Sequence, residues 1–374
     1  MMSKPVLHNE FCDLLGIEYP ILLAGMGVGG RATPPKLVAA VSEAGGAGIM
    51  GCSGLSPEET RRRIHEVRSL TDKPFGIDLL LPAKISASAP TRQGVREQLE
   101  KDYPEHVAFV QGLIKQFNLP TAYPDDDIVV DNEYARTVID VILDEKVPIF
   151  AAGLGDPSVV VGPGHEQGMK ILGLSGSVRN ALRQKISGVD AVIAQGSEAG
   201  GHTGRVSSFP LIPQVVDEVS PVPVVAAGGI ADGRGVAASL ALGAQAAWIG
   251  TAFLVADECQ IYDDNKDQIL SGSSQNFEVN RIWTGKTVRV YDNEVSRAWR
   301  ESDLDPLPTP YQRILMEDFT ASAQRAGRHD LILNPAGQIS GMLKERKPAA
   351  QIMEELVEET IEQLNRLKNN ITYY

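Results

Sequence analysis

The stretch PVVAAGGIADGRGVAASLALGAQAAWIGTAF, residues 223–253, contains two consecutive units of the pattern that predicts the fold. The aliphatic run PVVAAG (223–228) is followed by a glycine-rich loop, a segment of helical periodicity and a second apolar run, AAWIGT (246–251). Short apolar runs that alternate with helices are typical of parallel strands that are buried on both faces of a sheet. The stretch therefore predicts an α/β protein.

The same pattern recurs along most of the chain. Eight strand-helix units over about 250 residues are the expected size of a (β/α)8 TIM barrel, whereas a doubly wound sheet usually has roughly five to seven strands. We therefore predict a (β/α)8 barrel. Besides the two runs above, the predicted strands are PILLA (20–24), AGIMG (47–51), PFGIDLL (74–80), VPIFAA (147–152), KILGLS (170–175) and DAVIAQ (190–195).

Helix signals lie between these runs. In TPPKLVAAVSEAGG (33–46), Thr33 is expected to cap the helix, Pro34 suits the first helical position and Gly45 suits the end. The run Arg61–Arg63 in the next such segment is interpreted as a solvated helix face rather than a phosphate site. Similar segments are SPEETRRRIHEVRSL (56–70), SVRNALRQKI (177–186) and DGRGVAASLALGA (232–244).

Two regions depart from the repeat within the barrel assigned to residues 1–258. Residues 82–145 form an insertion after the third strand, with one or two helices around the polar turn Asp125–Asp127, and are placed to cover the active face. Residues 259–345 are expected to form an appended subdomain or arm, and residues 346–374 a helix that docks on the barrel. The apolar stripe of that helix comprises Ile352, Met353, Leu356, Val357, Ile361 and Leu364.

Composition limits the partners and the location. The 35 basic and 48 acidic residues give a net charge of -13, which argues against nucleic acid or an acidic membrane surface as a partner. The first residues do not resemble a signal peptide and no long apolar segment occurs, so a cytoplasmic location is expected. Cys12, Cys52 and Cys259 lack the spacing of a disulfide framework or a zinc site, which predicts buried reduced thiols and no metal.

The first strand ends in PILLAGMGVGG (20–30), whose glycines match the G-x-G-x-x-G spacing of a dinucleotide-binding turn. That motif requires a helix at its last glycine and an acidic residue at the end of the second strand. Here the helix signal begins only at Thr33, and the second strand ends in Gly51-Cys52-Ser53. Two interpretations remain, a tight turn or small residues that let the backbone approach a flat ring.

Two further glycine-rich stretches follow later strands. In AQGSEAGGHTGR (194–205), His202 lies in a glycine-flanked loop after Gln195, and either proton transfer or an ordinary packed histidine fits it. AAGGIADGRG (226–235) and WIGTAF (248–253) follow the last two strands, where barrels of this type commonly bind phosphate through backbone N–H groups. Flavin mononucleotide (FMN) and phosphorylated sugars both use such sites. The expected contacts include Gly228, Gly229, Gly250 and the Thr251 hydroxyl.

These stretches, together with PFGID and TGKTVRVYDNE, resemble the nitronate monooxygenase family, formerly called 2-nitropropane dioxygenases, from residue 18 to about residue 295. AQGSEAGGH is the most specific element. The resemblance implies an FMN-binding barrel, with His202 as the base that deprotonates neutral nitroalkanes. Where the family usually has Asn, this chain has Asp78, which could bind a substrate group or accept a hydrogen bond from a flavin N–H. The implied cofactor contacts are Gly25, Met26, Asp78, Gln195, Gly200, Gly201, Gly228, Gly229, Trp248, Ile249, Gly250 and Thr251.

The resemblance favours an FMN-dependent oxidoreductase that uses dioxygen to convert alkyl nitronates into a carbonyl compound and nitrite. Related flavin enzymes include NADH:quinone reductases and enoyl-acyl-carrier-protein reductases. One alternative is therefore an NAD(P)H-dependent flavin reductase that acts on a quinone or an acyl thioester. A flavin-free barrel lyase or isomerase with a phosphorylated substrate is a second alternative, and a non-catalytic binding protein is a third. The expected partners are a small-molecule substrate, dioxygen and, for the first alternative, NAD(P)H, while the oligomeric state, including a homo-oligomer, stays open.

Overall fold

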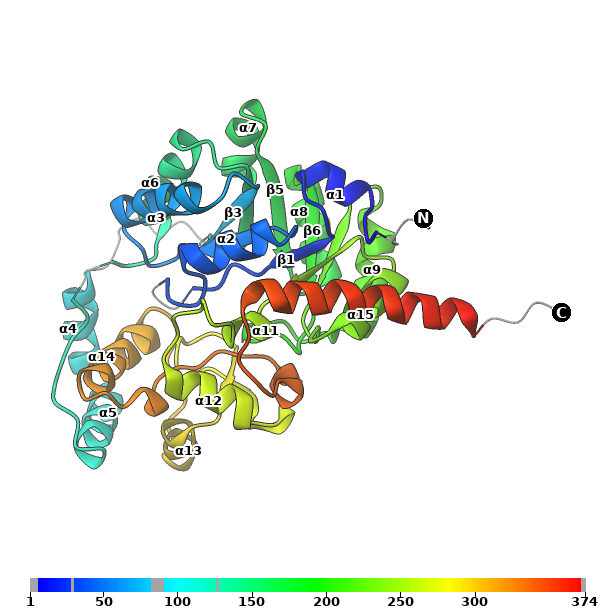
Figure 1. Ribbon diagram of the computed structural model, residues 1–374. Helices are drawn as coiled ribbons and strands as arrows, with labels where there is room; N and C mark the ends of the chain where they lie inside the picture. Colours follow the sequence, from blue (N-terminus) through cyan, green and yellow to red (C-terminus); the bar gives the residue numbers. More distant parts are fainter. Residues whose placement is uncertain (1–5, 28–29, 82–90, 126–127, 371–374) are drawn as a thin grey trace.

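The computed structural model describes residues 6–27, 30–81, 91–125 and 128–370. Eight parallel strands form one sheet in the order β1-β9-β8-β6-β5-β4-β3-β2, and a bridge from Leu22 to Ala47 brings β1 back to β2 (Figure 1). The predicted (β/α)8 barrel and its eight strands are confirmed. The strands are β1 (Ile21–Leu23), β2 (Gly48–Gly51), β3 (Phe75–Leu80), β4 (Ile149–Gly153), β5 (Lys170–Ser175), β6 (Ala191–Gln195), β8 (Val224–Ala227) and β9 (Ala246–Ile249).

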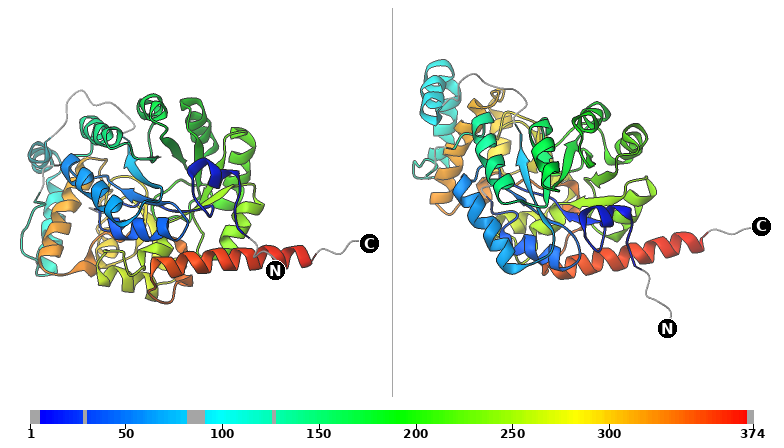
Figure 2. Two further views of the ribbon diagram at one scale, coloured as in Figure 1. Left: turned by 45° about the horizontal axis from the view of Figure 1, so that its top comes forward. Right: turned by 90° about the horizontal axis from the view of Figure 1, so that it is seen from above.

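Helices surround this sheet on its outer side, as the two views of Figure 2 show. The C-terminal helix α15 (Ala349–Asn369) packs on α10 and α2 and so lies between the last and the first helix of the ring. Its buried apolar residues are Ala349, Ile352, Met353, Leu356 and Val357, while Ile361 and Leu364 of the predicted stripe are partly buried. The other ring helices are α2 (Pro35–Glu43), α3 (Pro57–Leu70), α6 (Asn132–Asp144), α7 (Ser158–Glu166), α8 (Val178–Ser187), α9 (Ser208–Val219) and α10 (Gly233–Ala241).

The start of α2 differs from the prediction. Pro35 is the first helical residue and Pro34 is its N-cap, without a side-chain hydrogen bond. The Thr33 hydroxyl instead donates to the Met26 carbonyl at 3.0 Å and accepts from the Gly51 N–H at 2.8 Å. Thr33 therefore ties the β1–α2 loop to the end of β2 rather than capping the helix. Gly45 does follow the helix in the left-handed conformation, with φ at 89°.

The N-terminal end of the barrel is closed by the short helix α1 (Glu10–Leu15). Phe11 and Leu15 belong to the same apolar cluster as the inward-facing barrel residues Ile193 and Val225. The Asn9 amide, which caps α1, also donates to the Gln245 carbonyl just before β9. The C-terminal end of the barrel is thus the end that is left for a ligand.

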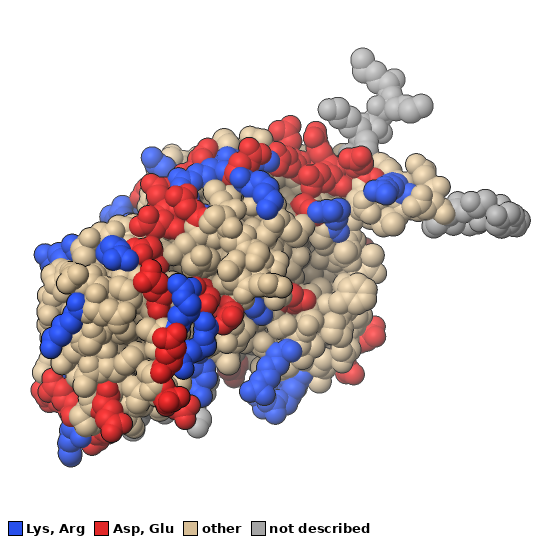
Figure 3. Space-filling model, turned by 90° about the horizontal axis from the view of Figure 1, so that it is seen from below, with Lys and Arg blue, Asp and Glu red and all other residues tan. Residues whose placement is uncertain are grey.

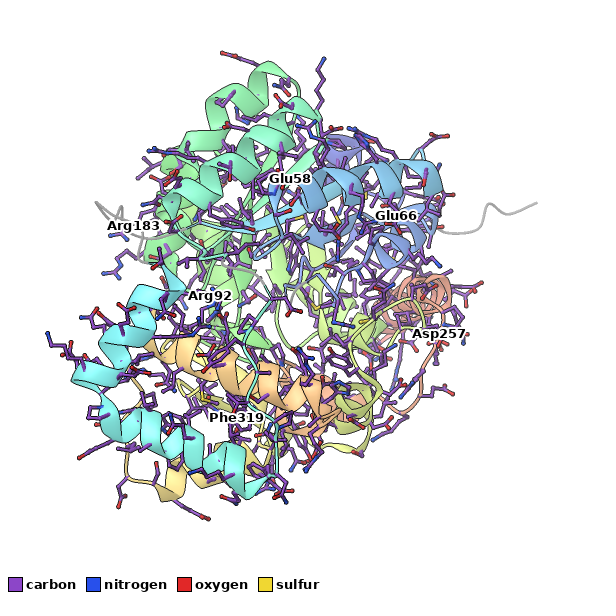
Figure 4. All side chains as sticks on the ribbon, turned by 90° about the vertical axis from the view of Figure 1, so that its left-hand side faces the viewer. Glu58, Glu66, Arg92, Arg183, Asp257 and Phe319 are labelled. Atoms are coloured by element: carbon purple, nitrogen blue, oxygen red, sulfur yellow. The ribbon has the colours of Figure 1, made fainter. Side chains whose placement is uncertain are left out.

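A second apolar core lies beside the barrel, and we call the elements around it the cap. Helices α4 and α5 come from the insertion, and α13, α14, β10 and β11 come from the region after the barrel (Figure 4). The described part of residues 82–145 holds three helices, of which α4 and α5 belong to the cap and α6 (Asn132–Asp144) belongs to the barrel ring. Asp126 and Asp127 of the predicted polar turn lie outside the described residues. The cap elements are α4 (Arg92–Asp102), α5 (Pro104–Gln116), β10 (Phe277–Asn280), β11 (Val288–Tyr291), α13 (Glu294–Glu301) and α14 (Tyr311–Arg325).

The remaining elements are β7 (Gly201–His202), α11 (Thr251–Leu254), α12 (Asp263–Ser271) and short 3-10 turns at Ser274–Asn276, His329–Leu331 and Gln338–Met342. The three cysteines are buried free thiols, as predicted. Among the described helices, none has the length and apolarity needed to cross a membrane. On the face shown in Figure 3, acidic and basic side chains lie close beside one another.

Removal of one fully buried ring tests the core of the cap. Phe319 on α14 has no exposed surface (Figure 4), and Phe319→Ala is expected to lower the free energy of unfolding by about 3–5 kcal/mol. Phe209→Ala is a matched control, because Phe209 is 75% exposed and its loss should cost about 0.5 kcal/mol or less. Urea unfolding measures both. Equal losses for the two variants would contradict a packed core in the cap.

Candidate active site

The residues singled out in the sequence gather at one end of the barrel. Because all eight strands are parallel, their C-terminal ends share one rim. Inward-facing positions alternate along each strand, and Asp78, Gln195 and Trp248 fall on the inward set. The structure therefore brings together residues from β1, β3, β6, β8 and β9 that are up to about 200 positions apart in the chain.

The β1–α2 loop is fixed to its surroundings by side chains on both sides. Arg63 on α3 donates to the Gly30 carbonyl at 2.6 Å and to Glu59, and its side chain is only 14% exposed. Arg61 and Arg62 form exposed ion pairs, so the predicted solvated face holds for these two residues and is wrong for Arg63. The loop at Met26 is thereby held against the rim.

Gly25 and Asp78 are in direct contact. A Cβ atom on Gly25 would lie 2.1 Å from the Cβ of Asp78, so no larger residue fits at position 25. A Cβ on Gly153 at the end of β4 would lie 2.8 Å from Asp78 Oδ1. The carboxyl group of Asp78 therefore sits between the ends of β1 and β4 and faces the barrel axis.

Asp78 is buried, with 7% of its surface exposed. Burial raises the pKa of its carboxyl group to about 8. A carboxylic acid with such a pKa is mostly protonated at neutral pH, so that it has both a donor and an acceptor oxygen. Sequence reasoning located this residue but did not establish its charge.

The Gln195 side chain is hydrogen-bonded to the backbone of His202. The Gln195 side-chain amide at the end of β6 donates to the His202 carbonyl at 2.8 Å. His202 lies on β7, which pairs with β11 of the cap opposite Val288. Its ring Nδ1 is 3.2 Å from the Thr287 carbonyl. The catalytic candidate is therefore held between the barrel and the cap.

The hydrogen bond to Thr287 also assigns the state of the His202 ring. A carbonyl oxygen only accepts, so Nδ1 carries the hydrogen and Nε2 carries the lone pair of the neutral imidazole. Burial lowers the pKa of His202, the Thr287 carbonyl opposes this, and the positive charges of Lys286 and Arg313 lower it further. A neutral ring with a free lone pair is the form that a general base requires.

Close packing requires a glycine at position 200, whereas a positive φ favours one at position 201. A Cβ on Gly200 would lie 2.4 Å from the backbone of Ala336, so this position is filled by protein. Gly201 has φ at 73°, and its nearest heavy atom would be 4.0 Å away, on Pro335. Gly200 thus serves packing against the chain near residue 336, whereas Gly201 leaves bare backbone beside His202.

Glycines that follow the last two strands, β8 and β9, form a second cluster at the rim. A Cβ on Gly228 would lie 2.9 Å from the Gly196 carbonyl, whereas one on Gly229 would meet nothing closer than Glu198 at 3.6 Å. A Cβ on Gly250 would lie 3.3 Å from the Met26 sulfur. Gly229 and Gly250 are therefore the two positions of this cluster where backbone is most accessible.

The side chains of the segment Trp248–Thr251 lie partly in the core and partly at the rim. The Trp248 side chain packs in the barrel interior, and the Ile249 side chain packs outward in the layer of helices. The Thr251 hydroxyl accepts a hydrogen bond from the buried Gly337 N–H at 2.9 Å. The remaining hydroxyl hydrogen of Thr251 is free to be directed toward a ligand.

Sequence reasoning missed the segment 336–338. Besides the bond from Gly337 to Thr251, the Gln338 N–H donates to the Glu198 carbonyl at 3.0 Å. The segment connects the loop after β6 with the loop after β9 and forms a wall of the site. Its NPAGQ letters indicate a turn, but no local signal places that turn at the barrel rim.

Sequence reasoning also missed two cations near His202. Partial desolvation lowers the pKa of Lys286, and the Arg313 charge acts in the same direction. The Arg313 Nε donates a hydrogen bond to Glu317 Oε1 at 2.7 Å. The side of the site at the cap is therefore more basic than the net charge of the chain indicates.

A separate hollow of about 440 Å³ lies on the outer surface between α3 and α6. Figure 4 shows the α3 side chains Glu58 and Glu66 on this side of the molecule. The hollow contains none of the predicted site residues. The described residues also include no cluster of three or more His, Cys, Asp or Glu side chains that could hold a metal ion.

The rim offers bare backbone and polar side chains to a bound group. Bare backbone is accessible at Gly27, Gly201 and Gly229, where a Cβ would meet no protein atom closer than 3.6 Å. The buried carboxyl of Asp78 and the lone pair of His202 supply polar contacts. A TIM barrel with such groups at the C-terminal ends of its strands is the arrangement of a barrel enzyme.

Comparisons with known proteins identify the family. The nitronate monooxygenase family model matches residues 8–359. A protein of Staphylococcus aureus strain JH9 named "Probable nitronate monooxygenase" is 32% identical over 361 residues, which cover 93% of this chain and 96% of its own. This chain therefore belongs to the nitronate monooxygenase family and is an oxidoreductase.

Solved structures show a similar fold. A nitroalkane oxidase from Streptomyces ansochromogenes is 30% identical, with a TM-score of 0.82 and coverage of 96% of this chain and 100% of that chain. FabK from Thermotoga maritima is 32% identical, with a TM-score of 0.76 and coverage of 99% and 100%. The fold of the barrel together with the cap is thus shared with these proteins.

Asp78→Asn tests the buried acid in the ligand-free protein. Unfolding returns the pKa of the carboxyl group from about 8 to its ordinary value of 3.8. With respect to this group, the free energy of unfolding of wild type is therefore highest below pH 3.8 and falls as the pH rises toward 8. The amide does not titrate, and the variant is expected to gain up to ~4 kcal/mol relative to wild type near pH 7. Urea unfolding at several pH values measures this difference. A difference that does not grow with pH would contradict the assignment.

Proposed function

We propose that this protein is an FMN-dependent nitronate monooxygenase that uses dioxygen to convert alkyl nitronates into a carbonyl compound and nitrite. The observation that carries the proposal is the neutral His202 ring held at the rim among bare glycine backbone. Membership of the family and the likeness to the Streptomyces nitroalkane oxidase support it. The bound flavin would supply the electron-accepting chemistry.

The chain offers distinct residues for the two ends of the cofactor. Gly25, Met26, Asp78, Gln195, Gly200 and Gly201 would lie at the ring, with Gly25 and Gly200 shaping the walls. Gly228, Gly229 and Gly250 would hold the phosphate through the backbone, together with the Thr251 hydroxyl. Trp248 would act through the barrel core and Ile249 through its backbone only, because their side chains point away from the phosphate loops.

His202 would remove a proton from the carbon of a neutral nitroalkane through Nε2. Thr287 keeps the ring in the required tautomer, and burial, together with the positive charges of Lys286 and Arg313, lowers the pKa of His202 and favours the neutral ring. A nitronate has already lost that proton and would need only positioning. The cap side of the site would help to exclude water from the bound substrate.

Oxygen consumption and nitrite release test the activity. The flavin-loaded protein is expected to consume dioxygen and release nitrite when an alkyl nitronate is added. Absence of nitrite under these conditions would reject the proposal. Anaerobic bleaching of the flavin by NADH or NADPH within seconds would favour the flavin reductase alternative, for which the likeness to FabK is the supporting observation.

His202→Asn separates the two substrates. Loss of the base is expected to lower kcat/KM for neutral nitroethane by about 10²- to 10⁴-fold, while ethyl nitronate turnover changes by less than about tenfold. Because the His202 pKa is lowered, the acid limb of the wild-type profile with nitroethane should lie below pH 6.5. Unchanged nitroethane turnover in the variant would exclude His202 as the base.

A further inference from the structure

We propose that Asp78 is a neutral carboxylic acid in the working protein and donates a hydrogen bond to an acceptor atom of the group bound at the rim. This inference rests on the proposed function, because the group is then the flavin ring or the nitronate beside it. Both present oxygen or nitrogen acceptors. Asp78 would determine which charge state of the bound group is favoured.

The direction of the Asp78 side chain is set by the sheet. Asp78 pairs with Gly51 on one side and Ala151 on the other, so its backbone is used in the sheet. Its side chain points inward between Gly25 and Gly153, and both lack the Cβ that would occupy its place. The carboxyl group is thus held in a fixed position at the barrel end where the ligand is expected.

The Asp78 carboxyl group has no protein partner among the described residues. Within the described ranges, the Asp78 carboxyl receives no hydrogen bond and no ion pair, and burial is the one cause of its shifted pKa. The facing strands β1 and β4 carry no ionisable side chain. Buried polar groups in proteins are normally hydrogen-bonded, so this group is expected to find its partner in the ligand.

The surroundings of Asp78 favour its uncharged form. Cys52 after β2 interacts electrostatically with Asp78, and burial raises the pKa of its thiol to about 12, so the thiol stays neutral and supplies no positive charge beside the carboxyl group. An ionised Asp78 would face the ligand without compensation, which is costly in a buried site. The protonated form has no such cost and adds a donor.

The competing arrangement is an ionised Asp78 that accepts a hydrogen bond from a ligand N–H. The two arrangements predict opposite pH trends. A donor is lost when the carboxyl ionises, so ligand affinity falls as pH rises. An acceptor is gained on ionisation, so affinity rises.

FMN affinity as a function of pH provides the test. The dissociation constant of FMN is measured by fluorescence quenching from about pH 6 to about pH 9 for wild type, Asp78→Asn and the exposed control Asp217→Asn. Affinity should fall about tenfold per pH unit above the pKa in wild type and in the control. Affinity of Asp78→Asn should change by less than about twofold. A rise with pH in wild type that the variant lacks would overturn the proposal. Where wild type and Asp78→Asn follow the same trend, nitrite binding decides between the outcomes.

A second arm locates the acceptor. If FMN affinity is insensitive to pH, the same comparison is made with nitrite binding to the FMN-loaded protein, observed as a change in flavin absorbance. A fall with pH in wild type alone places the acceptor on the substrate, and the absence of a fall in both arms overturns the proposal.

Infrared spectra keep the inference separate from the proposed function. Ligand-free wild type at pH 7 should show a protonated carboxylic acid band that Asp78→Asn lacks, whether or not FMN binds. Absence of that band would overturn the inference alone. Failure of wild type to retain FMN would overturn the proposed function alone.

Discussion

Closure of the eight-stranded sheet is the constraint on which the arrangement of the site depends. β1 pairs with β9 over three residues and meets β2 through Leu22 and Ala47. Without this closure, the loop that carries Gly25 and Met26 would have no fixed distance to β3, β4 or β9. With it, Asp78 is pressed against Gly25, and Met26 lies beside Gly250, although these residues are far apart in the sequence.

The cap adds a second constraint, because the site is not formed by the barrel alone. His202 belongs to a small sheet with β11, and Gly200 packs against the chain at Ala336. The bond from Gly337 to Thr251 connects the cap side to the residues that follow β9. Any shift of the cap would therefore move the histidine and one wall of the site together, which links the stability of the second core to function.

The sequence predicts those features that depend on local pattern. Each strand is a short apolar run buried on both faces, so its position can be predicted from the sequence. Thr33 shows the limit of such reasoning, because its hydroxyl is bonded to Met26 and Gly51 rather than to the helix it precedes. Arg63 likewise sits in a charged run but turns inward to hold Gly30.

The parts of the site that could not be predicted arise from contacts between distant segments. The glycine pattern marks loops that follow the strands, but only the structure separates Gly25 and Gly200, where a side chain would collide with protein, from Gly201 and Gly229, which leave backbone accessible. The position of segment 336–338 and the raised pKa of Asp78 both depend on packing. Neither has a sequence signature of its own.

The central claim is that the rim binds FMN, and the visible absorption spectrum of the purified protein after incubation with FMN and removal of free flavin tests it most directly. The account predicts flavin absorbance with about one FMN per chain. A colourless protein after this treatment would contradict the account and favour a flavin-free barrel enzyme.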